Sequence, residues 1–260
     1  MAGALESFRK ALAIDQDLLS SDSANSDNQL TVATDYSNIG EATYYSGDPR
    51  GALENYRKAF QIYKSVELED PKNARAKSSV ARGYRRIADM LVNTGNESEA
   101  VATYRKAAQA FDDLVQTDPA NSKSKGNLAL ILKDLGMLLA KKGDSTEALE
   151  VGRKSLSIAQ QISGANPSNT ELSVIVATVS SGLGSMHAAF ASDIRRNPAM
   201  RLAEWHEARD WFQKSMDVWN GLKAGGKFTS VEYGGPERVQ QEITRCDAAI
   251  AKLLKRNLDR

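Results

Sequence analysis

The chain has 260 residues, and its 34 Lys and Arg residues against 33 Asp and Glu residues leave a formal net charge of +1. This balance excludes a strongly basic surface of the kind that binds nucleic acids or anionic membranes, so any charged site must be local. The 41% hydrophobic and 26% charged residues are typical of a folded globular chain. Cys246 is the single cysteine, which excludes an internal disulfide and a metal site built from several cysteines.

An internal repeat is the most informative feature of the sequence. Four segments share a pattern of Ala, an aromatic residue or its equivalent, Arg-Lys and a small residue, and they begin at residues 3, 51, 99 and 147, which are 48 residues apart. A fifth copy begins at residue 207, which is 60 residues after the fourth. One connection, around residues 191–202, is therefore expected to carry twelve extra residues. A period of this length indicates one supersecondary unit per repeat.

A second motif has the same period and precedes the second, third, fourth and fifth of these segments. It pairs an aliphatic residue with Ala at 32–33, 80–81, 128–129 and 176–177, and a small residue follows at 40, 88, 136 and 184. Apolar residues recur at i, i+4 and i+7, as in Ala52, Tyr56 and Ala59, which is the spacing of an amphipathic helix. The small residues are expected to let the two helices of a pair approach closely.

Turn residues separate the two helices of each unit, and each unit from the next. Gly-Asp or Gly-Asn at 47–48, 95–96 and 143–144 is expected to end the first helix, because Gly readily takes the positive φ found at helix C-termini. Pro71, Pro119 and Pro167 follow the second helices, which they cannot extend. Each unit is thus predicted to be a pair of helices of about 20 residues, and such pairs bury their apolar faces only by stacking.

We therefore predict an all-α solenoid over residues 1–260. It divides into a second helix of an incomplete repeat at 1–30, helix pairs at 31–73, 74–121, 122–169 and 170–222, and a Gly-rich loop with a capping helix at 223–260. Residues 172–191 carry no acidic or basic side chain, but their Ser, Thr, Gly and His content favours a buried repeat helix over a membrane span.

The residues at these positions resemble the tetratricopeptide repeat. Its aromatic, Leu-Gly, Ala, aromatic and Ala positions correspond to Tyr36, Ile39, Gly40, Gly47, Ala52, Tyr56 and Ala59. The resemblance implies a right-handed α-α superhelix, here with extended helices, because the period is 48 residues and not the usual 34 of that family. Gly152 and Ser155 depart from the expected aromatic residue and Ala, and Gly152 suggests looser packing in that unit.

The end of the chain is similar to the C-terminal repeat tails of bacterial multidomain Ser/Thr protein kinases. The residues that carry the similarity are Ala208–Ser215, Gly221–Gly235, Pro236–Val239 and Cys246–Leu253. It implies a non-catalytic module of a larger bacterial signalling protein. A kinase domain itself would need a phosphate-covering Gly loop, His-Arg-Asp and Asp-Phe-Gly, and the sequence has none of the three.

The residues that could act in catalysis, metal binding or nucleic-acid binding have simpler structural interpretations. His187 and His206 belong to no paired metal motif, and Cys246 is expected to be a small buried residue. The Arg-Lys pairs at 9–10, 57–58, 105–106 and 153–154 follow inward-facing residues, so they should point outward, which argues against a nucleic-acid track. Gly182 and Gly184 are expected to be packing glycines. We expect no enzyme activity, cofactor or metal.

The tetratricopeptide resemblance places a concave groove along the first helices. The groove residues that it implies are Tyr44, Tyr45, Arg82, Arg85, Asp89, Asn93, Lys133, Met137, Lys141, Ser181 and Ser185. The cations in the middle of this set would suit an acidic or C-terminal carboxylate peptide, while solvated surface charges remain the alternative.

The favoured function is a protein-binding scaffold. The alternative is an oligomerisation or structural tail, because residues 4–19 lack a partner helix and their Leu5, Phe8, Leu12 and Leu18 would form an exposed apolar stripe. The chain starts without a secretory signal, which favours the cytoplasm, and a membrane-spanning parent protein would allow an extracytoplasmic location.

Overall fold

The computed structural model describes residues 2–226 and 235–258, and these ranges contain ten α-helices and no strand. The helices are α1 (Ala2–Ser21), α2 (Ser26–Tyr45), α3 (Pro49–Glu69), α4 (Ala74–Asn93), α5 (Glu97–Thr117), α6 (Ser122–Lys142), α7 (Ser145–Ala165), α8 (Thr170–Ser192), α9 (Pro198–Ala224) and α10 (Pro236–Leu258). The all-α repeat class is confirmed. Most of the predicted Gly-rich loop, residues 227–234, lies outside the described residues.

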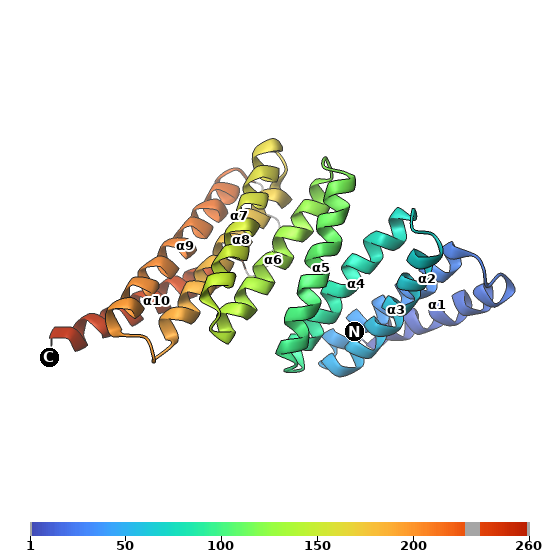
Figure 1. Ribbon diagram of the computed structural model, residues 1–260, viewed down its shortest axis with the longest axis horizontal. Coiled ribbons are helices and arrows are strands. Elements are labelled where there is room, and N and C mark those ends of the chain that lie inside the picture. The colour runs from blue at the N-terminus through green and yellow to red at the C-terminus, as the bar shows by residue number, and fades with distance from the viewer. Residues whose placement is uncertain (1, 227–234, 259–260) are drawn as a thin grey trace. The chain divides into compact units, whose positions relative to one another are not determined.

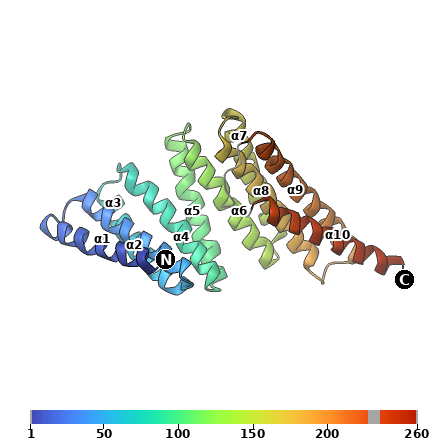
Figure 2. The ribbon, with the colours of Figure 1, turned by 180° about the vertical axis from the view of Figure 1, so that it is seen from behind.

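The helices form two compact units, Met1–Asp118 with α1–α5 and Pro119–Arg260 with α6–α10. Within each unit every helix packs against the next one in the chain, and α6 also packs against α8 (Figure 1, Figure 2). The core of the first unit includes Leu30, Ala59, Tyr63 and Val80 from α2, α3 and α4. The helix α2 begins at Ser26, so the expected boundary between residues 30 and 31 falls inside a helix.

The ends of the first helices, α2, α4 and α6, follow the predicted turn chemistry. Gly47, Gly95 and Gly143 have φ values of 90°, 82° and 91°. At Gly95 the backbone N–H donates to Val92, and the next N–H, of Asn96, donates to Leu91 at 2.8 Å. This pairing satisfies carbonyl groups that the helix end would otherwise leave exposed.

The first helix of each pair begins after an asparagine N-cap, a recurring feature that the sequence analysis did not use. Asn25, Asn73, Asn121 and Asn169 are the N-caps of α2, α4, α6 and α8, and their side chains accept hydrogen bonds from backbone N–H groups of the first turn. A cap of this kind stabilises a helix by about 1 kcal/mol relative to Ala. Each helix pair therefore has its own start signal, at the 48-residue period.

The small residues of the repeat bring paired helices together, as predicted. An added Cβ at Gly40 would lie 2.9 Å from the ring of Tyr56, and one at Gly184 would lie 2.9 Å from the ring of Phe212. Gly182 is also a packing residue, since an added Cβ there would lie 2.3 Å from Cγ of Lys133. Both predicted packing glycines of α8 are confirmed.

The packing around Gly152 is not loose, and here our interpretation was wrong. An added Cβ at Gly152 would lie 2.9 Å from both Leu183 Cδ2 and Met186 Sδ, and Met186 is fully buried. The Met186 side chain thus fills the space that an aromatic residue occupies elsewhere in the repeat. The neighbouring Ser155, in place of Ala, donates a 2.6 Å hydrogen bond to the carbonyl of Ala129, which satisfies its buried hydroxyl.

The twelve extra residues lie mainly in helix and not in a long connection. The connection between α8 and α9 is only residues 193–197, whereas α9 begins at Pro198 and the repeat spacing would place its start near residue 205. A cluster of side chains joins the C-terminal end of α8 to the N-terminal part of α9. In it, His187 Nδ1 lies 2.7 Å from Glu204 Oε2, and Arg196 lies 5.0 Å from the centre of the Phe190 ring.

The two terminal helices differ in how they are covered. On α10, Val239, Ile243, Cys246, Ile250 and Leu253 join the core that α8 and α9 form, as expected of a capping helix. On α1, Leu5, Phe8 and Leu12 are half-buried, whereas Leu18 and also Ile14 are exposed.

The apolar helix α8 is long and apolar enough to cross a membrane, but 61% of its most apolar window is buried within the fold.

Asp35 of α2 is a buried carboxylate at a position where the other repeats have Gly83, Ile131 and Val179. Among the described residues its Oδ2 has no hydrogen-bond partner. Burial, and then the neighbouring Asp15 carboxyl of α1, raise the pKa of Asp35 to about 6. The protonated form is therefore the one that suits the packed α1 and α2.

We predict that Asp35→Asn makes the stability of the protein less dependent on pH. A carboxyl whose pKa is raised by folding stabilises the fold fully below its unfolded pKa of 3.8, and this contribution is lost as the pH rises through 6. The variant should match the wild type near pH 4 and be more stable by about 1–3 kcal/mol above pH 7. Urea unfolding across this range measures it, with the exposed Asp17→Asn as control. Parallel pH profiles for wild type and Asp35→Asn would contradict the prediction.

A pair of glycine substitutions separates backbone conformation from packing. Neither Gly95 nor Gly221 has an atom within 4 Å of an added Cβ, but only Gly95 has a positive φ. Gly95→Ala should destabilise the protein by about 1–2 kcal/mol, because the left-handed conformation is strained for Ala. Gly221→Ala, within α9, should stabilise it by about 0.5 kcal/mol. Thermal unfolding would refute this account if the two variants shifted in the same direction.

Candidate functional site

In the first unit, the predicted groove residues of α4 share one helix face and are already engaged within the fold. Arg82 and Asn93 are exposed, while Arg85 and Asp89 are half-buried. Arg82 Nη2 donates to Ser79 Oγ at 3.1 Å, and Asn93 Nδ2 donates to the Asp89 carbonyl at 2.8 Å. The Asp89 carboxylate accepts a 2.5 Å hydrogen bond from Tyr104 of α5. Asp89 therefore positions the inward-facing tyrosine of its own helix pair.

The predicted aromatic pair lies at the C-terminal end of α2. The rings of Tyr44 and Tyr45 are 5.6 Å apart between centroids, with planes tilted by 57°. Tyr44 is 37% exposed and Tyr45 is 62% exposed, which is unusual for two large adjacent rings in a folded chain. Together they offer an apolar contact surface with two hydroxyl groups.

The sequence analysis missed Arg86, which connects three helices of the first unit. Its guanidinium donates to the Tyr56 hydroxyl of α3 at 2.9 Å and to Glu41 of α2 at 3.4 Å, and it lies 5.2 Å from the centre of the Tyr56 ring. Burial raises the pKa of the Tyr56 hydroxyl. A basic residue next to the groove position Arg85 was the available signal, but its partners lie on other helices.

In the second unit, four of the predicted residues come together around one small cavity. Lys133 and Met137 of α6 and Ser181 and Ser185 of α8 line a space of about 100 Å³. The aliphatic part of Lys133 packs on Gly182, and its Nζ lies 2.6 Å from Asp134 Oδ1. We call this the α6–α8 cavity.

The α6–α8 cavity is completed by residues that the sequence analysis did not assign to the site. Trp219 of α9 and Arg238, Val239 and Glu242 of α10 also line it. The pattern of α10 indicated a cap, and nothing in its spacing showed that its polar side would face a cavity. Lys141, the remaining predicted residue of this unit, instead lines a separate pocket with Asp193, Arg195 and Arg196.

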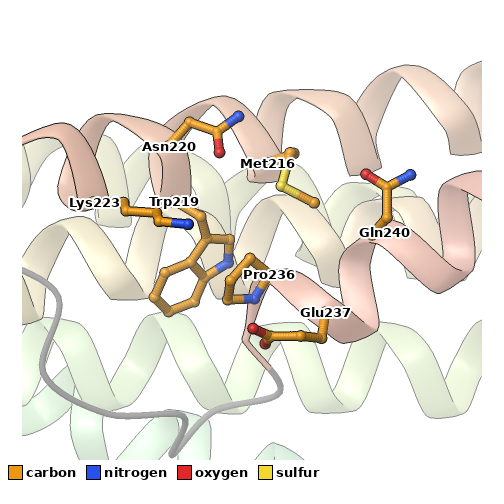
Figure 3. Close-up of a pocket in the computed structure, with 7 residues that line it drawn as sticks. All are labelled: Met216, Trp219, Asn220, Lys223, Pro236, Glu237 and Gln240. Atoms are coloured by element: carbon orange, nitrogen blue, oxygen red, sulfur yellow. The ribbon is translucent and has the colours of Figure 1, made fainter.

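A pocket larger than the α6–α8 cavity also has Trp219 in its lining. Met216, Trp219, Asn220 and Lys223 of α9 and Pro236, Glu237 and Gln240 of α10 line a volume of about 420 Å³. Figure 3 shows the indole of Trp219 beside the ring of Pro236, with the polar ends of Lys223 and Glu237 near it. Trp219 thus lines both this pocket and the α6–α8 cavity.

One histidine and the cysteine that could act in catalysis or metal binding are buried within the fold. His187 is buried against Glu204, and Cys246 is fully buried, where burial raises the pKa of its thiol to about 11. All four Arg-Lys pairs are exposed, as predicted. In residues 2–226 and 235–258 no group of three or more His, Cys, Asp or Glu side chains is placed to hold a metal ion.

Comparison with known families supports the repeat assignment. One model of the tetratricopeptide repeat matches residues 32–70 and 127–169, and a second model of the same repeat matches residues 81–113. The chain therefore contains tetratricopeptide repeats over these residues. Its all-helical repeats are of the kind that typically serves as a non-catalytic scaffold for protein interactions.

One solved structure is similar to this chain in fold, and a second is a weaker match. The crystal structure of BtubC (BKLC) from P. vanneervenii is similar over 97% of this chain and 91% of its own, with 15% identity and a TM-score of 0.56, which shows the fold alone. The hypoxic regulator of sterol synthesis Nro1, described as a nuclear import adaptor, covers 96% of this chain and 90% of its own at 10% identity and a TM-score of 0.44. Comparison with curated proteins gave no match.

Proposed function

We propose that this chain is a non-catalytic scaffold that binds a protein or peptide on the faces of its first helices. The observation that carries the proposal is the α6–α8 cavity, because Lys133, Met137, Ser181 and Ser185, which the tetratricopeptide resemblance selected, line one concave space. It combines a cation, a thioether and hydroxyl groups, and its volume of about 100 Å³ suits a single small side chain of a peptide.

The α4 face supports the same function in the first unit. Arg82 and Asn93 are exposed donors, and Arg85 adds a second guanidinium on the same helix face. Guanidinium groups form strong, oriented hydrogen bonds with carboxylates, so an acidic segment or a C-terminal carboxylate is the ligand chemistry that fits. The resemblance to bacterial kinase tails supports the further proposal that the scaffold is a module of a larger bacterial signalling protein. The single repeat array over residues 1–260 stays a prediction.

The groove proposal can be tested by selecting binding peptides from a random dodecapeptide library on the purified chain. The selected peptides should be rich in Asp and Glu. Arg82→Glu should weaken the binding of peptides that occupy the α4 face, and Lys133→Glu that of peptides that occupy the α6–α8 cavity, each by roughly tenfold, because each change reverses a charge that the peptide contacts. Arg153→Glu, an equal charge change on the exposed face of α7, is the matched control. Peptides that respond equally to Arg153→Glu, or to neither groove change, would count against the groove.

Self-association through α1 is a second candidate function, and the exposure of Ile14 and Leu18 favours it. They are 68% and 52% exposed, whereas Val66, which occupies the position of Leu18 one repeat later, is 1% exposed. The face of α1 that corresponds to a covered face of α3 is therefore open to water, at a cost that association would remove.

Sedimentation over a concentration series tests this candidate, with Ile14→Gln and Leu18→Gln combined as the variant. These two side chains are better targets than Leu5 and Phe8, which are half-buried and contribute to the fold. A wild-type dimer that the double variant converts to a monomer would support self-association. A wild-type chain that stays monomeric at all concentrations would refute it and leave the groove proposal untouched.

A further inference from the structure

The short connection between α8 and α9 forms a second concave site in the second unit. Residues 193–197 lie against the C-terminal end of α6, and the pocket between them has a volume of about 330 Å³. We call it the connection pocket. Its walls include Lys141 at the end of α6, Phe190 at the end of α8, and Asp193, Arg195 and Arg196 of the connection.

The charges of the connection pocket favour an anionic ligand. Three of its lining residues are cations, Lys141, Arg195 and Arg196, and one is a carboxylate, Asp193. Lys141 is exposed, and the side chain of Arg195 is 82% exposed, so a ligand can reach both. The chain as a whole carries a net charge of only +1, so this concentration of cations is local.

The two arginines are held in position by other side chains. Asp193 accepts hydrogen bonds from Arg195 Nε at 2.8 Å and from Arg195 Nη2 at 2.9 Å, and a guanidinium has five N–H donors, so this pairing uses two of them. Arg196 lies over the Phe190 ring and pairs with Glu204 at 3.5 Å. Because the side chains are already ordered, a ligand loses less free energy in fixing them.

An exposed apolar residue, which does not itself line the pocket, lies between two of the lining residues in the sequence. Ile194 lies between Asp193 and Arg195 and is 81% exposed, more than any other large hydrophobic residue in the described part of the chain. An aliphatic side chain this exposed next to a cationic pocket offers a contact for an apolar residue of a ligand. A peptide can supply a carboxylate and an aliphatic side chain together, whereas a nucleic acid offers phosphates and bases but no aliphatic side chain.

We propose that the connection pocket is a second binding site, which takes the carboxylates of an acidic segment of a partner protein while Ile194 contacts a neighbouring apolar side chain of that segment. The site is separate from the α6–α8 cavity and the α4 face, since it shares none of their lining residues. It therefore extends the scaffold to two contact regions within one unit and does not depend on the groove being occupied.

Fluorescence anisotropy with a labelled peptide of glutamates around one central leucine tests the proposal. Saturable binding to the full chain is expected, and Arg195→Glu and Lys141→Glu should each weaken it by roughly tenfold. Both residues are exposed, and circular dichroism and thermal unfolding would show that the variants remain folded. Arg153→Glu, the same charge change on α7, should alter the affinity by less than about twofold.

The alternatives give distinct results. If Arg153→Glu weakens binding as much as Arg195→Glu, the peptide responds only to overall charge and the proposal is wrong. If Lys133→Glu weakens binding and Arg195→Glu does not, the peptide occupies the groove, which overturns the connection pocket and supports the proposed function. A glutamine version of the peptide that binds equally well, oligothymidylate that binds more tightly, or no saturable binding would each overturn the proposal.

Discussion

The close approach of the two helices in each pair is the constraint on which the rest of the structure depends. Gly40 and Gly184 leave room for the rings of Tyr56 and Phe212, and this contact sets the position of α3 against α2 and of α9 against α8. Interiors pack densely, so one added methyl group at these positions would force a ring and its helix to move. In the other two pairs the small residues Ala88 and Gly136 occupy the same repeat position.

The protein combines a regular repeat interior with three sites that depart from the repeat pattern. Asp35 replaces an apolar residue at the α1–α2 contact, the connection at 193–197 brings two arginines to the end of α6, and α10 adds polar side chains beside Trp219. Each departs from the repeat pattern. The recurring positions explain why the chain folds, and these departures carry most of what distinguishes it from any other array of helix pairs.

Sequence periodicity was sufficient to predict the helices, their turns and the packing glycines, because those features depend on residues close together in the chain. The tetratricopeptide resemblance also selected Lys133, Met137, Ser181 and Ser185, which are four of the eleven residues that line the α6–α8 cavity. The contributions of Trp219, Arg238 and Glu242 could not be predicted, because they depend on how the last helix folds over its neighbours. The packing around Gly152, which stands where other repeats have an aromatic residue, was also predicted wrongly. The side chain that fills the space, Met186, belongs to the following repeat.

The pairing of Gly152 with Met186 has a consequence for how this chain can change. A repeat protein is often treated as a series of interchangeable modules, and the N-cap asparagines at 25, 73, 121 and 169 would fit that view. The third and fourth helix pairs, however, depend on each other, because Met186 of the fourth pair fills the space beside Gly152 of the third. Transplanting either one alone would leave a void beside Gly152 or a clash with Met186, so these two repeats must be inherited, duplicated or engineered as a single cassette.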